Sequence, residues 1–265
     1  MAGEPQTWHY GLVAKWWAEF NVDGPEIPYF QAVIERYGQP ALDVACGTGR
    51  LLVPYLRAGL DVDGCDISPD MLALCRDKAA SEGLEPRLYR QAMHELDLPR
   101  MYRTIFLCGG FGLGGDRELA LKGLGRFYDL LEPGGVLAFD HQLPYRNARV
   151  WQYWLPENRS QLPEVWTAPG ERRPAADGAE YALSTNLADV DPLEQLVTLR
   201  IRAEEWRDGV LVAQEEHTLK ESLYFKNEVI MMLESAGFGD IAVYGSYTEV
   251  PATSQDTDLV FIAKK

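Results

Sequence analysis

Two glycines and a carboxylate at a defined spacing are the first residues in this chain that suggest chemistry. Gly47 and Gly49 follow a short, largely apolar run, and Asp66 ends a second such run seventeen residues after Gly49. Glycine lets the backbone approach a ligand where a side chain would collide, and free N–H groups at a helix start bind polar ligand atoms. A carboxylate at about this distance suits the two hydroxyls of a ribose. The spacing therefore predicts a site for a nucleotide-type cofactor.

The segments that must hold these residues alternate between strand and helix. Short apolar runs predict strands from Ala41 and over 61–66, 87–90, 104–108 and 136–140. Helices are predicted between them, from Leu51, from Ser68 with its following proline, and over 118–131. Parallel strands joined by helical crossovers form a doubly wound sheet, which binds ligands at the carboxyl ends of its strands. The predicted cofactor site lies at such an edge.

The flanking segments are predicted to form a cap and an insertion. Apolar residues at helical spacing predict helices over 8–20 and 28–37, within an N-terminal helical cap at 1–38. An inserted antiparallel β substrate or lid region is predicted at 148–222. Its evidence is three segments of alternating apolar and polar residues, at 180–189, 195–207 and 210–220. The stretch 141–177 shows no period and is expected to be irregular.

The C-terminal segment is predicted to return to the main sheet through a helix at 224–236 and strands at 241–244 and 259–263. We therefore predict an α/β fold with a Rossmann-like, doubly wound, mostly parallel seven-stranded sheet and an inserted antiparallel β-meander. The cofactor-binding domain would comprise residues 39–147 and 223–265.

Charge and composition exclude several partners. The 265 residues carry 25 basic and 40 acidic side chains, a formal net charge of −15, which disfavours nucleic acid and anionic membranes. The N-terminus lacks the pattern of a secretory signal, and the four cysteines show no metal-ligand or disulfide spacing. We expect a cytoplasmic protein with reduced core cysteines, no bound metal and a small-molecule substrate.

Three motifs in order resemble the class I S-adenosylmethionine-dependent methyltransferases. They are the stretch from Asp43 to Gly49, the stretch from Asp66 to Met71, and the run Leu131-Glu132-Pro133-Gly134-Gly135. Ala236-Gly237-Phe238 also resembles that family, and the aromatic first helix with the inserted meander is similar to its small-molecule N- or O-methyltransferases. The resemblance implies S-adenosyl-L-methionine as cofactor and methyl transfer as activity.

The resemblance also implies roles for individual residues. Gly47 and Gly49 would lie under the methionine part of the cofactor, Asp43 near its amino group, and Asp66 on the ribose hydroxyls. The residues expected to line the rest of the site are Ala45, Ile67, Met71, Ala92, Met93 and Cys108, with Ile67 and Met71 packed on adenine. Ala92 stands where the family usually has an acidic side chain, so adenine would be held by backbone groups and shape.

A base and a substrate wall can be proposed at the same edge of the sheet. His141 follows Asp140 at the end of a predicted strand and is our candidate base, although it fits equally well as a polar residue of a strand end. Tyr10, Trp16, Trp17 and Tyr145 are candidate walls able to surround a cationic sulfonium or amine, and the tryptophans fit a core role as well.

Other functions fit parts of the pattern. A nicotinamide-dependent oxidoreductase would need a third glycine where Leu52 stands. An enzyme that methylates bases would need an Asn/Asp-Pro-Pro-aromatic loop, whereas this chain has Cys108-Gly109-Gly110-Phe111. A magnesium-dependent enzyme would need an Asp-Asn pair in place of Asp140-His141. A non-catalytic protein that binds S-adenosylmethionine is the alternative that Ala92 favours.

Overall fold

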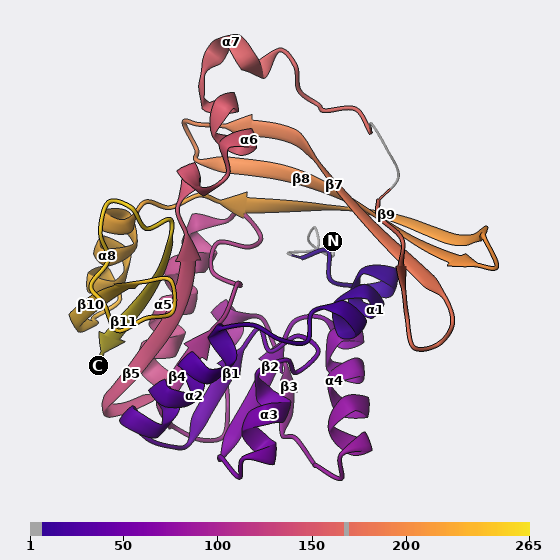
Figure 1. Cartoon of the computed structure of the whole chain (residues 1–265). Helices are drawn as coiled ribbons and strands as arrows, with labels where there is room; N and C mark the ends of the chain where they lie inside the picture. The colour runs from indigo at the N-terminus through magenta and orange to yellow at the C-terminus, as the bar shows by residue number, and fades with distance from the viewer. Residues whose placement is uncertain (1–6, 167–169) are drawn as a thin grey trace.

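Two β-sheets, one above the other, define the architecture of the computed structural model, which describes residues 7–166 and 170–265. The lower sheet has seven strands in the order β10-β11-β5-β4-β1-β2-β3. The upper sheet has four, in the order β6-β7-β8-β9, and crosses over the lower one (Figure 1). We call this upper sheet the roof. Residues 1–6 of the predicted cap and residues 167–169 of the predicted irregular stretch lie outside the described residues.

The lower sheet is mostly parallel. Strands β1 to β5 run in one direction, and β11 is antiparallel to both β5 and β10. The strands span β1 (Ala41–Val44), β2 (Val62–Asp66), β3 (Leu88–Arg90), β4 (Tyr102–Leu107), β5 (Leu131–Gln142), β10 (Gly239–Gly245) and β11 (Asp258–Lys264). This arrangement and the additional antiparallel sheet confirm the predicted fold class.

Strand β5 begins earlier than the sequence suggests. The run Pro133-Gly134-Gly135 was expected to precede the strand, but Leu131 already pairs with Tyr102 of β4. The pairing is irregular between that point and the pair Thr104–Val136. The proline and glycines therefore form a bulge inside the strand, a position where both residue types are tolerated.

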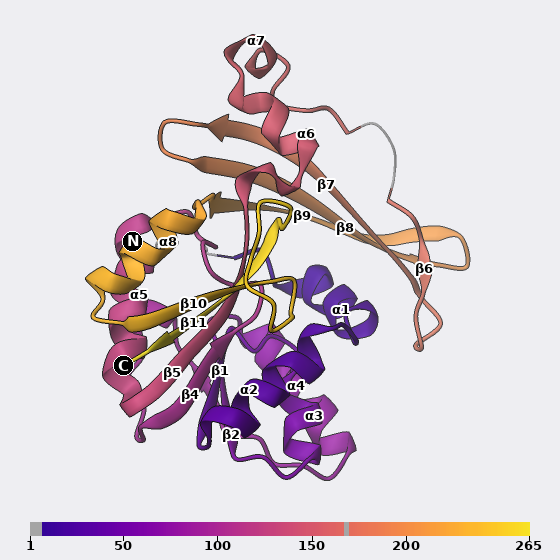
Figure 2. The same cartoon turned by 60° about the vertical axis from the view of Figure 1, so that its left-hand side comes forward.

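Helices cover both faces of the lower sheet, as Figures 1 and 2 show. On one face, α2 (Glu26–Tyr37), α3 (Leu52–Arg57) and α4 (Pro69–Ser81) contribute to an apolar core that includes Phe30 and Phe106. On the other face, α5 (Arg117–Leu130) and α8 (Lys226–Ser235) pack on Leu137 and Phe139. The sheet is therefore doubly wound, with its strand ends free to bind a ligand.

The roof is an antiparallel meander. Its long strands are β7 (Glu180–Asp191), β8 (Leu196–Arg207) and β9 (Val210–Ser222), and the two-residue strand β6 (Arg173–Pro174) is added at one edge. The stretch before it contains the short helices α6 (Ala148–Trp151) and α7 (Pro156–Arg159) and the 3₁₀ turns η2 (Pro144–Arg146) and η3 (Gln152–Trp154). Elements this brief leave no detectable period in a sequence.

The first helix, α1 (Gly11–Phe20), lies between the roof and the lower sheet (Figures 1 and 2). The Gly11 amide donates to Asp70 Oδ2 of α4 at 2.8 Å, and the Leu12 amide donates to Glu215 Oε2 of β9 at 2.9 Å. Carboxylates from both layers thus satisfy the free N–H groups of this helix start. Among the described residues, no helix has the length and apolar character required to cross a lipid bilayer.

Candidate functional site

A cleft lies between the carboxyl ends of β1, β2 and β4 on one side and α1 with the residues before it on the other. Its floor comes from the loop after β1, from Asp66 and Ile67 at the end of β2, and from residues 91–94. Its far wall comes from residues 108–110 and 112–114, after β4, and its near wall from Thr7, His9, Trp17 and Asn21. The cleft is therefore at the edge of the sheet where the sequence predicts a ligand.

The two glycines of the first loop do different things. Gly47 lines the cleft at φ +54°, and a Cβ placed there would have Ala45 O as its nearest neighbour, at 4.0 Å. Gly49, at φ +78°, is not part of the lining. A Cβ at Gly49 would lie 2.6 Å from Cys75 Sγ and 3.0 Å from Val53 Cγ2, so it allows the loop to pack against α3 and α4.

The carboxylate of Asp66 is buried at the floor of the cleft and anchored by backbone groups. Oδ2 accepts from the Gly47 amide at 2.9 Å, and Oδ1 accepts from the Ser68 amide at 2.8 Å. Burial raises the pKa of Asp66, and the hydrogen bonds from the backbone oppose that rise. Each oxygen has a second lone pair, so the carboxylate can still accept hydrogen bonds from a ligand.

Asp43, which is 2% exposed, also faces the cleft. Among the described residues, none hydrogen-bonds to its buried Oδ2 atom. Burial, reinforced by nearby Cys75 and Asp66, raises the pKa of Asp43 well above its ordinary value. A buried carboxylate oxygen without a partner is costly, so this atom is suited to a ligand that brings a hydrogen-bond donor or a positive charge.

Five further residues predicted to bind cofactor also line the cleft, namely Ala45, Ile67, Met71, Ala92 and Met93. Ala92 directly precedes the 3₁₀ turn η1 (Met93–Glu95), and its methyl side chain brings no carboxylate to that side of the cleft. Gln91 and His94 line the same side, and sequence reasoning assigned no role to either. This part of the wall is mainly apolar, as expected for a surface that packs on a flat ring.

Cys108, a predicted cofactor residue, lines the cleft, and so does Arg50. The sequence analysis gave no role to Arg50, although this residue directly follows Gly49. Arg50 forms an ion pair with Glu26 of α2, and its Nη2 lies 3.5 Å from Cys108 Sγ. Asp140 supports the same wall from behind, because its Oδ1 accepts from the Gly109 amide at 2.6 Å. Burial is the main cause that raises the pKa of both Cys108 and Asp140.

The near wall is aromatic. Trp17 lines the cleft, and its ring meets that of His9 edge to face, with ring centroids 5.0 Å apart. Thr7 Oγ1 hydrogen-bonds to His9 Nδ1, and burial lowers the pKa of His9 to about 4. His9 is therefore neutral at physiological pH. Sequence reasoning missed Thr7 and His9, because these two residues precede the helix instead of sharing its periodicity.

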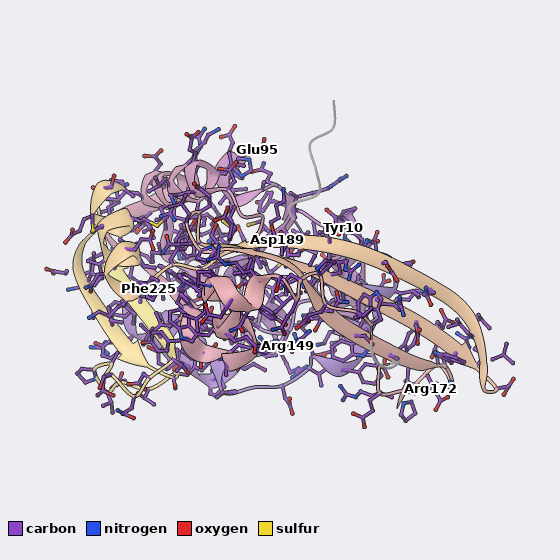
Figure 3. The ribbon with its side chains drawn as sticks, turned by 90° about the horizontal axis from the view of Figure 1, so that it is seen from above. Tyr10, Glu95, Arg149, Arg172, Asp189 and Phe225 are labelled. Atoms are coloured by element: carbon purple, nitrogen blue, oxygen red, sulfur yellow. The ribbon has the colours of Figure 1, made fainter. Side chains whose placement is uncertain are left out.

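The other predicted substrate residues are placed elsewhere. Tyr10 caps α1 outside the lining, and burial together with the nearby charge of Asp66 raises its pKa. Trp16 packs with Phe20 under the roof. Tyr145 is 40% exposed and contacts Trp151, in an aromatic group that continues to Phe225. Phe225 and Tyr10 lie well apart in the view from above (Figure 3).

The position of His141 removes the reason for proposing it as the base. Its side chain was expected to face the transferred group at the end of β5, but the residue is 6% exposed and absent from the lining of the cleft. Its Nε2 donates to the Tyr224 carbonyl oxygen at 2.9 Å, and burial lowers its pKa. Successive side chains of a strand point to opposite faces, so His141 shares the core face of Phe139.

The sequence is similar to known methyltransferases. Residues 41–135 match the family model described as a methyltransferase domain. A protein of Geobacillus sp. (strain WCH70) that carries a methyltransferase name is 25% identical over 244 residues, which cover 89% of this chain and 90% of that protein. The similarity therefore extends beyond the cofactor loops to most of the chain.

Solved structures share the fold, including the roof. An S-adenosylmethionine-dependent methyltransferase from Clostridium acetobutylicum superposes with a TM-score of 0.70 at 20% identity, over 94% of this chain and 96% of that one. The sugar N-methyltransferase KedS8 from Streptoalloteichus sp. superposes with a TM-score of 0.65 at 17% identity, over 100% and 98% of the two chains.

Proposed function

We propose that this chain transfers a methyl group to a nitrogen or oxygen atom of a small molecule. The proposal starts from the premise that the chain carries a class I S-adenosylmethionine-dependent methyltransferase domain. The observation that carries this proposal is the placement of the cleft. Cofactor-type residues line its floor, while α1 and the roof stand over the strand ends. Such a cover suits a small substrate better than a polymer.

The residues of the floor fit the cofactor. Asp43 offers to a cationic amino group a buried carboxylate oxygen that no described residue binds, and Asp66 offers lone pairs to a ribose diol. Gly47 leaves the open space that a close backbone approach needs. Ile67 and Met71 would pack on adenine, and Ala45, Ala92, Met93 and Cys108 would complete the wall. Gly49 would act indirectly, by holding the loop against α3 and α4.

S-adenosylmethionine, when bound, supplies a methyl group on a positively charged sulfur. The chain then has to align the acceptor atom and exclude water, which are large contributions in a displacement of this kind. Trp17 provides an aromatic face that attracts positive charge. His9 provides a neutral imidazole whose Nδ1 is held by Thr7. We assign no role as a base to His141, because its ring is in the core.

The relatives support a small substrate. KedS8 is a sugar N-methyltransferase, and its superposition covers the roof as well as the cofactor-binding sheet. We therefore infer that the roof region belongs to the substrate side of the site.

The test is a methyl-transfer screen with purified full-length protein and S-adenosylmethionine. The acceptors would be amines, phenols, carboxylic acids and sugars, with detection of S-adenosylhomocysteine and of the methylated product by mass. We expect transfer to at least one class and thermal stabilisation by S-adenosylmethionine but not by NAD. Cofactor binding without transfer to any class would favour the non-catalytic alternative, and stabilisation by NAD alone would refute the proposal.

A further inference from the structure

Glu221, near the end of β9, lies where the loop after β4 joins the roof. Leu113 and Glu221 form an antiparallel bridge. On either side of it, the Gly114 amide donates to Lys220 O and the Ser222 amide donates to Gly112 O, both at 2.8 Å. Residues directly opposite in such a pair project their side chains from the same face and at close range. Leu113 lines the cleft, so Glu221, which is not itself part of the lining, projects from the roof on the side of Leu113.

The neighbours of Glu221 on that face are apolar. Leu219, two residues earlier on β9, shares its face and packs with Leu113 and Trp17 in one cluster. Opposite Glu221 on β8 stands Val197, which is buried. Glu216 projects from the other face of β9, where it forms an ion pair with Arg202. The nearest neighbours of the Glu221 carboxylate on this face are thus apolar, and the next carboxylate on the same face of β9, that of Glu215, is bound by the Leu12 amide.

This carboxylate lacks compensation. Within residues 7–166 and 170–265, no hydrogen bond or ion pair involves its side chain, and burial is the sole cause that raises its pKa. Glu221 is partly buried, and a charge held among apolar side chains without a partner is unfavourable until a group of opposite charge arrives. A ligand with a positive charge would supply that partner.

The charges around the cleft favour the same kind of ligand. Asp43, Asp66 and Asp116 line it, and the charge of Arg50, which also lines it, is balanced by Glu26. The whole chain carries a net charge of −15. A cleft lined by one sign of charge concentrates ligands of the opposite sign, and Trp17 adds an aromatic face for a cation.

We propose that the substrate is a small amine with an apolar or sugar body, and that Glu221 binds its ammonium group. The proposal rests on the proposed function and narrows it to a substrate class. Glu221 supplies the charge that recognises the amine, and the surface formed by Leu113, Leu219 and Trp17 packs against its body.

The test compares Glu221→Gln with wild type and with Glu216→Gln, a control on the other face of the same strand. The probes are matched pairs, namely benzylamine with benzyl alcohol, cyclohexylamine with cyclohexanol, and 3-amino-3-deoxyglucose with glucose. Calorimetry on protein saturated with S-adenosylhomocysteine measures the preference for amine over alcohol. We expect the wild type and Glu216→Gln to prefer at least one amine, and Glu221→Gln to lose about tenfold or more of that preference, as for a charged hydrogen bond.

Two results of the binding measurements would overturn the proposal. One is a wild-type protein that prefers no amine over its alcohol, and the other is a Glu221→Gln protein that keeps the wild-type preference. The affinity for S-adenosylhomocysteine and the methyl transfer to each probe are measured on the same samples. If alcohols are methylated while amines are ignored, the amine proposal fails and the proposed function stands. Failure of cofactor binding in the wild type would remove the proposed function itself.

Discussion

The floor and the roof of the cleft are built in different ways. On the floor, the Gly47 amide donates a hydrogen bond to the Asp66 carboxylate, 19 residues away in the sequence. The Ser68 amide donates to the same carboxylate from a separation of 2 residues. At the roof, the Leu12 amide binds Glu215 across 203 residues, and Leu113 pairs with Glu221 from a separate part of the chain. The floor is a set of local loops, whereas the roof exists only when distant segments meet.

This difference separates two kinds of residue. Residues of the floor stand at the ends of strands in a fixed order, so their types and spacing predict their position. Residues of the roof and of the near wall depend on strand register and on the docking of α1. Substitutions on the two sides should therefore have different consequences, and four of them test this contrast, from the largest expected effect to the smallest.

The packing of the floor is most sensitive at Gly49. We expect Gly49→Ala to lower the free energy of unfolding by about 3 kcal/mol, because alanine adds both a strained φ and a collision with Cys75. Gly59→Ala is the matched control. Gly59 has the same φ of +78° with nothing within 4 Å of its added Cβ, so about 1 kcal/mol is expected. If urea unfolding shows the same loss of free energy for Gly49→Ala and Gly59→Ala, the close packing at Gly49 does not contribute to stability.

The ligand contacts of the floor are tested at Asp66. We expect Asp66→Ala to weaken S-adenosylhomocysteine binding by about 2 kcal/mol, since charge-assisted hydrogen bonds to the ribose would be lost. Calorimetry measures the affinity, and Asp77→Ala, at an exposed position of α4, serves as control. Unchanged affinity in Asp66→Ala would contradict the assignment of the ribose site.

A substitution of His141 tests whether this residue has a structural role in the core or acts as a base. Because its ring donates to the Tyr224 carbonyl in the core, we expect His141→Ala to lower the free energy of unfolding by about 1.5 kcal/mol. Loss of a general base would instead slow methyl transfer by about a hundredfold or more. Turnover per folded molecule near the wild-type value would match the core position, and a hundredfold loss at full stability would restore His141 as the base.

The near wall is tested by the pH dependence of stability. Burial lowers the pKa of His9 to about 4, so below about pH 6.5 the unfolded chain binds a proton there that the folded chain does not. This term lowers stability as the pH falls from about 6.5 to about 4. Between pH 7 and pH 5.5, His9→Asn should lose about 1 kcal/mol less stability than the wild type. Parallel curves for the two proteins would show that His9 titrates normally.

The alternation of side chains between the two faces of a strand explains why the prediction for His141 was wrong. Asp140 and His141 are adjacent at the end of β5, yet Asp140 binds the Gly109 amide beside the cleft and His141 faces the core. A shift of one residue exchanges the two faces of a strand, and the sequence alone does not set that register. The same parity places Glu221 under the roof and Glu216 on its other face, a distinction that alternation of residue types did not reveal.

The amino-acid sequence by itself determined the parallel sheet, the glycine loop and the carboxylate of Asp66, because each depends on contacts over short stretches of chain. Only the tertiary structure decided that Gly49 packs instead of lining the cleft, that His9 lies beside Trp17, and that the Glu221 carboxylate has no partner among the described residues. These facts depend on which distant segments meet and in what register. The burial of apolar surface and the docking of α1 determine which segments meet and in what register, and the local spacing of residues does not predict either.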